Sequence, residues 1–133
     1  MLLWRWNMNV VLLFKQDSHT IGIYNSSTEL ITLPKLYFDD FVNDYHIKQL
    51  IKLIYNVEVQ FMLRAFELEE QNIIVYIIVA SDLSEIVFPM EIDSLHYLPM
   101  TNLTKLDNVT EIDKEIMRVA IGLFNDTYIS EYE

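Results

Sequence analysis

The chain contains no cysteine, so it can form neither disulfide bonds nor thiolate metal sites. It has only two glycines and three prolines in 133 residues, which argues against long flexible linkers and glycine-rich phosphate-binding loops. Basic residues are also scarce, because nine Lys and Arg stand against twenty Asp and Glu, giving a net charge of −11. Since phosphate contacts need Lys and Arg, we expect no nucleic-acid binding. An acidic surface would suit a basic partner protein or serve solubility alone.

No apolar run is long enough to cross a membrane, so we expect no membrane association. The apolar start of the chain, residues 1–14, is interrupted by asparagines and is followed by no small-residue cleavage site. We therefore interpret it as a strand preceded by an aromatic anchor at Trp4 and Trp6, and not as a signal peptide. Without an export signal, we expect a cytoplasmic protein.

Hydrophobic residues make up 52% of the chain and charged residues 22%, which is the composition of a globular protein. At this length we expect one domain spanning residues 1–133. Residues 73–80 form a continuous, largely β-branched run that is typical of a strand at the centre of a sheet. Residues 57–68 alternate between apolar and polar, and Glu69 to Asn72 form a polar turn. The predicted strands are 9–15, 21–24 (returning as a hairpin), 57–68, 73–80, 86–88 and 94–98, and the apolar segment 30–33 is broken by Pro34.

Two segments have the spacing of helices. The first starts at Asp39 and Asp40, because acidic residues are favoured in a first turn, and runs to about Asn56. Its apolar residues form more than one stripe, so we expect it to be covered on two sides. The second helix opens at Thr110, in a capping-box pattern with Asp in place of Glu, and runs to about Phe124. Its predicted apolar side consists of Ile112, Ile116, Met117, Val119, Ala120 and Leu123. This element order predicts an α+β fold, an α/β/α sandwich with a mixed β-sheet and one helix on each face.

The order and spacing of these elements resemble the Nudix fold over nearly the whole chain. Leu33-Pro34 stands where that family has a Leu-Pro-Gly-Gly-type segment before its main helix. Asn56-Val57 stands where the family helix ends in a glycine and an aliphatic residue, and Asn is the next best residue for a left-handed C-cap. The family next has a hairpin, which corresponds to 73–80 here. It then has a short strand with an aromatic-Leu-Pro-type ending, which corresponds to 91–99, and a last helix, which corresponds to 110–124.

The Nudix signature is G-x5-E-x7-R-E-U-x-E-E-x-G-U, where U is aliphatic. The resemblance implies diphosphate hydrolysis, in which glutamates at i, i+3 and i+4 on one helical face bind Mg²⁺ or Mn²⁺. No acidic residue lies between Asp44 and Glu58, so neither a gapless register nor one shifted by one residue restores a metal-binding carboxylate. With Asn56 at the final glycine, Lys35 replaces the first glycine, Phe41 the first glutamate and Gln49 the arginine, while Leu50, Leu53 and Ile54 replace the three metal-binding glutamates.

The sequence therefore predicts no catalytic residue and no cofactor. We expect a non-catalytic Nudix-like domain that acts as a ligand-binding, protein-interaction or regulatory module. One alternative is a divergent hydrolase of nucleoside-diphosphate-linked compounds, which would hold Mg²⁺ or Mn²⁺ through displaced carboxylates. Its candidates are Glu67, Glu69, Glu70 and Glu91. A second alternative is an acidic inhibitor or immunity-type protein that binds a basic partner.

The residues Leu50, Leu53 and Ile54, called here the aliphatic set, leave two interpretations open. They are either the core of a filled cleft or the lining of an apolar pocket or protein interface. In the second case Trp4, Trp6 and Tyr55 would add an aromatic rim. We expect a homodimer or another protein partner, and a small-molecule ligand stays open. The candidate ligand or interface residues are Trp4, Trp6, Tyr55, Arg64, Glu67, Glu69 and Glu70.

Overall fold

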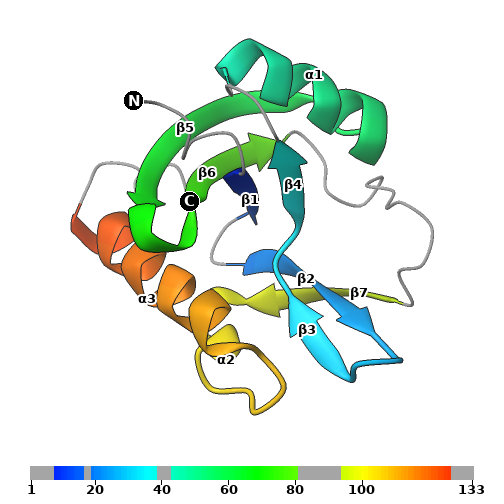
Figure 1. The fold of residues 1–133 in the computed structure, drawn as a ribbon, viewed down its shortest axis with the longest axis vertical. Coiled ribbons are helices and arrows are strands. Elements are labelled where there is room, and N and C mark those ends of the chain that lie inside the picture. The colour runs from blue at the N-terminus through cyan, green and yellow to red at the C-terminus, as the bar shows by residue number, and fades with distance from the viewer. Residues whose placement is uncertain (1–7, 17–18, 39–42, 81–93, 127–133) are drawn as a thin grey trace. The chain divides into compact units, whose positions relative to one another are not determined.

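The computed structural model describes residues 8–16, 19–38, 43–80 and 94–126 (Figure 1). They form two compact units: one contains 8–14, 34–38 and 43–80, and the other contains 15–16, 19–33 and 94–126. The fold is α+β with helices and a mixed β-sheet, as the element order predicts. The single domain over 1–133 stays a prediction. The predictions made for Trp4, Trp6, Phe41, the strand 86–88 and Glu91 lie outside the described residues.

The first unit is built on a four-stranded sheet in the order β4-β1-β6-β5. β1 (Met8–Lys15) and β6 (Ile73–Ala80) lie in the middle, and both are almost entirely buried, as their continuous apolar runs predict. β5 (Val59–Leu68) pairs antiparallel with β6. β4 (Lys35–Phe38) pairs antiparallel with β1. The sequence predicts no strand at β4, because this short segment is held only by pairing with residues distant in the chain.

β5 departs from the strict alternation that its sequence predicts. Its register against β6 slips between Val59 and Phe61 and again between Arg64 and Phe66. Each slip is a β-bulge, in which an extra residue shifts the following side chains relative to the two faces of the sheet. The polar residues after β5 form the 3-10 helix η2 (Glu69–Gln71), which Asn72 closes in the left-handed conformation, and this confirms the predicted turn.

α1 (Asp44–Tyr55) is the helix of the first unit, and its start at Asp39 is a wrong prediction. Asn43 is extended, with φ −128° and ψ 158°, and its side-chain oxygen accepts a hydrogen bond from the amide of His46 at 2.8 Å. This cap satisfies an amide of the first turn and fixes the start of the helix at Asp44. Asn56 ends the helix at φ 57° and ψ 43°, with its N–H donating to the carbonyl of Lys52, which confirms the predicted C-cap.

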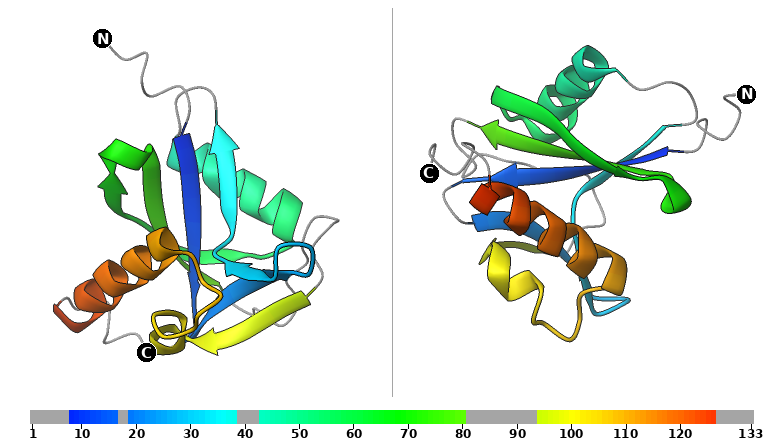
Figure 2. Two further views of the ribbon diagram at one scale, coloured as in Figure 1. Left: turned by 60° about the horizontal axis from the view of Figure 1, so that its bottom comes forward. Right: turned by 90° about the vertical axis from the view of Figure 1, so that its left-hand side faces the viewer.

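Only one stripe of α1 is buried, so the prediction that this helix is covered on two sides is wrong. Ile47, Ile51 and Tyr55 are spaced four residues apart and are at most 3% exposed. They form the side of α1 that packs on one face of the sheet (Figure 2), where the ring of Tyr55 meets that of Phe14 edge to face at 5.7 Å. The opposite side of α1 carries Leu53, which is 80% exposed.

The second unit is built on a three-stranded sheet in the order β3-β2-β7. β2 (His19–Asn25) pairs antiparallel with β3 (Leu30–Thr32) and with β7 (Ser94–Pro99), where the sequence predicts a hairpin with residues 9–15. Gly22 is required by a close approach, because a Cβ there would lie 2.7 Å from Cγ2 of Ile31. The short helix α2 (Met100–Leu103) follows β7 and packs against α3 (Glu111–Asp126).

α3 begins as its sequence predicts, but its buried side differs in detail. The hydroxyl of Thr110 accepts a hydrogen bond from the amide of Asp113 at 3.4 Å, which is the expected cap. The carboxylate of Asp113 is buried and accepts from the amide of Leu33 at 3.2 Å, so it joins α3 to the end of the 30–33 segment. Val119 is exposed, contrary to its predicted place on the apolar side, whereas Met117 is fully buried.

Thr20 in β2 provides a test of packing in the second unit. Its side chain is fully buried, and its hydroxyl has no hydrogen-bond partner among the described residues. Because an unpaired buried hydroxyl costs free energy, Thr20→Val is expected to raise the free energy of unfolding by about 1 kcal/mol. Urea denaturation would measure this change in the free energy of unfolding, with Thr101→Val, a substitution at an exposed threonine, as the control. A loss of stability in Thr20→Val would show that the hydroxyl is satisfied in solution.

Candidate functional site

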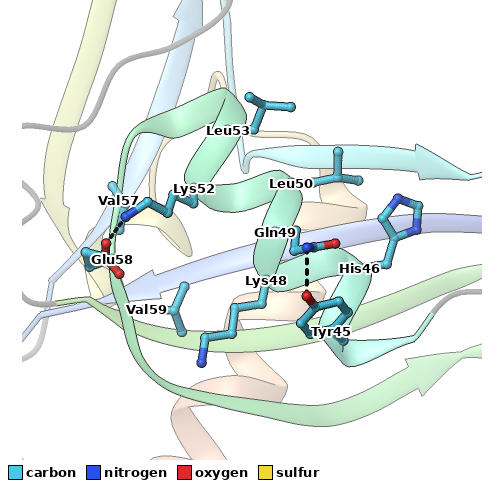
Figure 3. A pocket seen from close by; sticks show the side chains of 10 residues that line it. All are labelled: Tyr45, His46, Lys48, Gln49, Leu50, Lys52, Leu53, Val57, Glu58 and Val59. Carbon is cyan, nitrogen blue, oxygen red and sulfur yellow. Dashed lines mark hydrogen bonds and ion pairs between the residues drawn. The ribbon is translucent and has the colours of Figure 1, made fainter.

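A surface groove of about 780 Å³ borders the outer side of α1 (Figure 3). All its lining residues belong to the first unit, and seven of the ten come from α1 itself. The chain that leaves the helix after Asn56 supplies the remainder. The lining consists of Tyr45, His46, Lys48, Gln49, Leu50, Lys52, Leu53, Val57, Glu58 and Val59.

The periodicity of α1 sorts these side chains into rows. Tyr45, Gln49 and Leu53 are spaced four apart and form the row opposite the buried stripe; we call it the outer row. Tyr45 and Leu53 are 71% and 80% exposed, and the hydroxyl of Tyr45 accepts a hydrogen bond from the side-chain amide of Gln49 at 2.9 Å. The outer row therefore places two large apolar side chains in contact with water.

Lys48 and Lys52 form a second row beside the outer row, spaced four residues apart. Lys52 forms an ion pair with Glu58, in which both side chains are well exposed. Lys48 has no ion pair or hydrogen bond within the described part of the chain. Glu58 is the only acidic residue of the lining, so the groove carries more positive than negative charge. This local charge is opposite in sign to the net charge of −11.

The aliphatic set is divided between the groove and its surroundings. Leu50 is half-buried and Leu53 is exposed, and both line the groove; Ile54 is half-buried and lies outside the lining. The interpretation that these residues form the core of a filled cleft is wrong for Leu53, because a core side chain would be shielded from water. Of the other predicted signature positions, Gln49 also lines the groove, whereas Lys35 lies in β4.

Tyr55 does not contribute an aromatic rim. It is 3% exposed and packs on Phe14, so it belongs to the core of the first unit, and burial raises the pKa of its hydroxyl. Its position four residues after Ile51 puts it on the buried stripe of α1. The aromatic residue that does face solvent on this helix is Tyr45, which the sequence analysis does not single out as a site residue.

A polar cluster joins the start of α1 to the sheet of the first unit. The hydroxyl of Tyr76 in β6 donates to the carboxylate of Asp44 at 2.5 Å, and Arg64 in β5 forms an ion pair with Glu67. Burial, and then the hydrogen bond and charge of Asp44, raise the pKa of Tyr76. Partial burial works to lower the pKa of Arg64, but Glu67 and the other neighbouring groups outweigh it, so the pKa is raised. Arg64 and Glu67 are thus brought together, but away from the groove lining.

The remaining candidate carboxylates do not join this cluster into a metal site. Glu69 and Glu70 are exposed in η2. Across residues 8–16, 19–38, 43–80 and 94–126, no group of three or more His, Asp and Glu side chains is placed to hold a metal ion. Mg²⁺ and Mn²⁺ require oxygen ligands, and Leu50, Leu53 and Ile54 offer none. The residues at the predicted metal positions therefore do not fit either ion.

None of the helices in the described part of the chain combines the length and hydrophobicity needed to cross a lipid bilayer.

Sequence reasoning misses Lys48, Lys52 and Glu58 as groove residues. The spacing of the two lysines is a signal that could have placed them on one side of the helix. The position of Glu58 depends on the course of the chain after Asn56, which the sequence alone does not reveal.

No family model matches the sequence, and no curated protein matches it. Solved structures do match. A structure assigned to the Nudix hydrolase family from Chromobacterium violaceum superposes with a TM-score of 0.68, covering 95% of this chain and 85% of that chain at 14% identity. A NUDIX-family hydrolase from Clostridium perfringens gives 0.63, covering 89% and 97% at 10% identity. A MutT NUDIX hydrolase from Burkholderia pseudomallei gives 0.54, covering 84% and 95% at 8% identity.

At these identities the likeness establishes the fold and leaves the activity open. It agrees with the fold that the element order predicts. The chain therefore has a Nudix-like α+β fold.

Proposed function

We propose that this chain is a non-catalytic Nudix-like module that binds a ligand or a partner protein through the outer side of α1. The observation that carries the proposal is the side chain of Leu53, which is 80% exposed beside Leu50 in the groove. Exposed apolar groups that lie together are unfavourable in water, and they commonly mark a surface that another molecule covers. In the resemblance to the Nudix signature, both leucines occupy positions that hold metal-binding glutamates.

The conformation of α1 supports aligning the signature with Asn56 at its final glycine. Asn56 has φ 57°, in the region that favours glycine. Ile51 and Val57, which then occupy the two aliphatic positions, are 0% and 2% exposed. A register shifted by one residue would put Tyr55 at the glycine and Asn56 at an aliphatic position, and neither residue suits that place. The favoured register gives the three metal positions to the aliphatic set.

The first experiment tests whether the protein carries out metal-dependent chemistry. We expect Mg²⁺ and Mn²⁺ at millimolar concentration to leave the melting temperature unchanged, because an ion that bound the folded state would raise it. We also expect no phosphate release from a panel of nucleoside-diphosphate-linked compounds. Differential scanning fluorimetry and a phosphate assay on the full chain measure the two quantities.

The control for this experiment is the triple variant Glu67→Gln, Glu69→Gln, Glu70→Gln. If the wild-type protein shows a metal-dependent melting shift with phosphate release, and the triple variant loses both, the displaced-carboxylate hydrolase is correct and the non-catalytic proposal fails. The exposure of Glu69 and Glu70 keeps these two substitutions from disturbing the core. Glu67→Gln removes one ion pair with Arg64, so the melting temperature of the metal-free variant is measured alongside.

Two proposals about partners accompany this function. A homodimer would show an increase in molar mass by light scattering across a concentration series. An acidic inhibitor or immunity-type protein would capture basic proteins in a complex that high salt dissolves, because surface charge attraction is screened over about 10 Å at 0.1 M salt. Neither proposal needs a catalytic group.

A further inference from the structure

We infer that the outer row of α1 (Tyr45, Gln49 and Leu53) docks an amphipathic acidic helix of a partner protein, in which a carboxylate pairs with Lys48. This inference rests on the non-catalytic module proposed above and names the class of molecule that the module binds. It is drawn from the exposure of the row, from the length of α1 and from the charge beside the row.

The exposure of the outer row favours a macromolecular partner over a small ligand. A small-molecule site encloses most of its ligand. Here the main apolar contributors, Leu53 and Tyr45, are 80% and 71% exposed on the convex side of a helix, so they can be covered only from outside. α1 has 12 residues, which corresponds to about 18 Å at 1.5 Å per residue. A partner helix of about three turns matches this length, and its apolar stripe would lie along the row.

The charge beside the outer row selects an acidic partner. Lys48 and Lys52 flank the row on one side, and Figure 3 shows Lys52 extending to Glu58 and Lys48 extending toward the strand that contains Val59. Lys52 is paired with Glu58, whereas Lys48 has no ion pair or hydrogen bond in the described residues. A carboxylate on the partner would form an ion pair with the ammonium group of Lys48. The opposite flank carries Leu50, which extends the apolar contact.

The same charges disfavour a second copy of this chain as the occupant. In a two-fold symmetric contact of α1 with α1, the same surface meets itself, so Lys48 and Lys52 of one copy would approach those of the other. A partner that presents carboxylates at the contact instead meets positive charge within the screening distance of about 8 Å at physiological salt.

The test uses the full chain and three fluorescent synthetic peptides of about 16 residues. One has a Leu stripe at helical spacing flanked by Glu, the second has the same stripe flanked by Lys, and the third has the composition of the first in scrambled order. Fluorescence anisotropy measures the dissociation constants. We expect the Leu/Glu peptide to bind at micromolar concentration and the scrambled peptide to bind at least about tenfold more weakly, because the scrambled order breaks the stripe.

Two pairs of variants carry the same charge change inside and outside the site. Leu53→Glu is matched by Tyr37→Glu, which changes an exposed apolar residue of β4, and Lys48→Glu is matched by Lys105→Glu. We expect Leu53→Glu and Lys48→Glu each to weaken binding of the Leu/Glu peptide about tenfold or more. The matched controls should change it by less than about twofold, since local contacts rather than net charge determine the affinity. Melting temperatures confirm that each variant is folded.

Three results would overturn the inference. The first is tighter binding of the Leu/Lys peptide that the groove variants leave unchanged, because attraction to the net charge alone would then explain it. The second is the absence of binding of any peptide at millimolar concentration. The third is a dimer, seen by light scattering, that Leu53→Glu dissociates, because the occupant would then be a second copy. The non-catalytic function fails separately, through metal binding or phosphate release, whatever the peptides do.

Discussion

Ile51→Ala is expected to destabilise the protein by about 2–5 kcal/mol, whereas Leu53→Ala is expected to change the free energy of unfolding by less than about 0.5 kcal/mol. The two residues lie two positions apart on α1, but Ile51 is 0% exposed and Leu53 is 80% exposed. Truncating Ile51 removes buried apolar contacts and leaves a cavity, while truncating Leu53 removes atoms that are already in water.

Urea denaturation followed by circular dichroism measures both variants, and the midpoints give the difference directly when the slopes agree. For a chain of this size, the loss at Ile51 corresponds to a fall in melting temperature of about 3–5 °C per kcal/mol. Equal losses in the two variants would restore the interpretation that the aliphatic set fills a cleft. A large loss at Leu53 alone would mean that α1 presents its other side to the sheet.

Tyr76→Phe is expected to lower the free energy of unfolding by about 1–2 kcal/mol at neutral pH. This is the second of the two largest expected effects on stability. The Tyr76 ring is fully buried, and its hydroxyl is the donor at 2.5 Å to the carboxylate of Asp44 at the start of α1. A hydrogen bond to a charged group is worth more than a neutral one, but Asp44 is exposed, so water replaces part of the loss. Tyr24→Phe, which changes a half-buried tyrosine of β2, is the control.

The raised pKa of Tyr76 also predicts how stability depends on pH. An unfolded tyrosine releases its proton near pH 10, whereas the folded protein holds the Tyr76 proton to higher pH. Above about pH 10 the folded state therefore binds more protons than the unfolded state, so stability falls as pH rises. Buried Tyr55 contributes in the same direction. Urea denaturation between about pH 8 and 11 should show a decline that is shallower in Tyr76→Phe; equal slopes would contradict this origin.

The parts of the fold that the sequence predicts correctly are those encoded locally. The continuous run of β6 and the cap residues Asn56 and Thr110 each depend on a few neighbouring residues, and the structure confirms them. The predicted start of α1 is wrong because, in the sequence alone, Asp39 and Asp40 resemble a first helical turn as closely as Asn43 resembles an N-cap. β4 is missed because its pairing with β1 brings together residues distant in the sequence.

The candidate site is predictable in its residue types and not in its exposure. The lack of carboxylates between Asp44 and Glu58 is evident from the sequence alone. Which of the many apolar residues of α1 faces water depends on how the helix rotates against the sheet, and that is decided by packing of Ile47, Ile51 and Tyr55. The pairing of Tyr76 with Asp44 likewise depends on tertiary contact between elements far apart in the chain.

The two bulges in β5 have a consequence for colloidal behaviour. β5 is one of the two edge strands of the four-stranded sheet in the described residues, and an open, regular strand edge is a template on which further chains can add to build fibrils. The bulges leave only the short regular stretch from Phe61 to Arg64 between them, and bulged strands bend and twist away from flat pairing. Although β6, the strand paired with β5, is strongly apolar, the β5 edge is therefore expected to resist edge-to-edge aggregation at concentrations where an unbulged edge would precipitate.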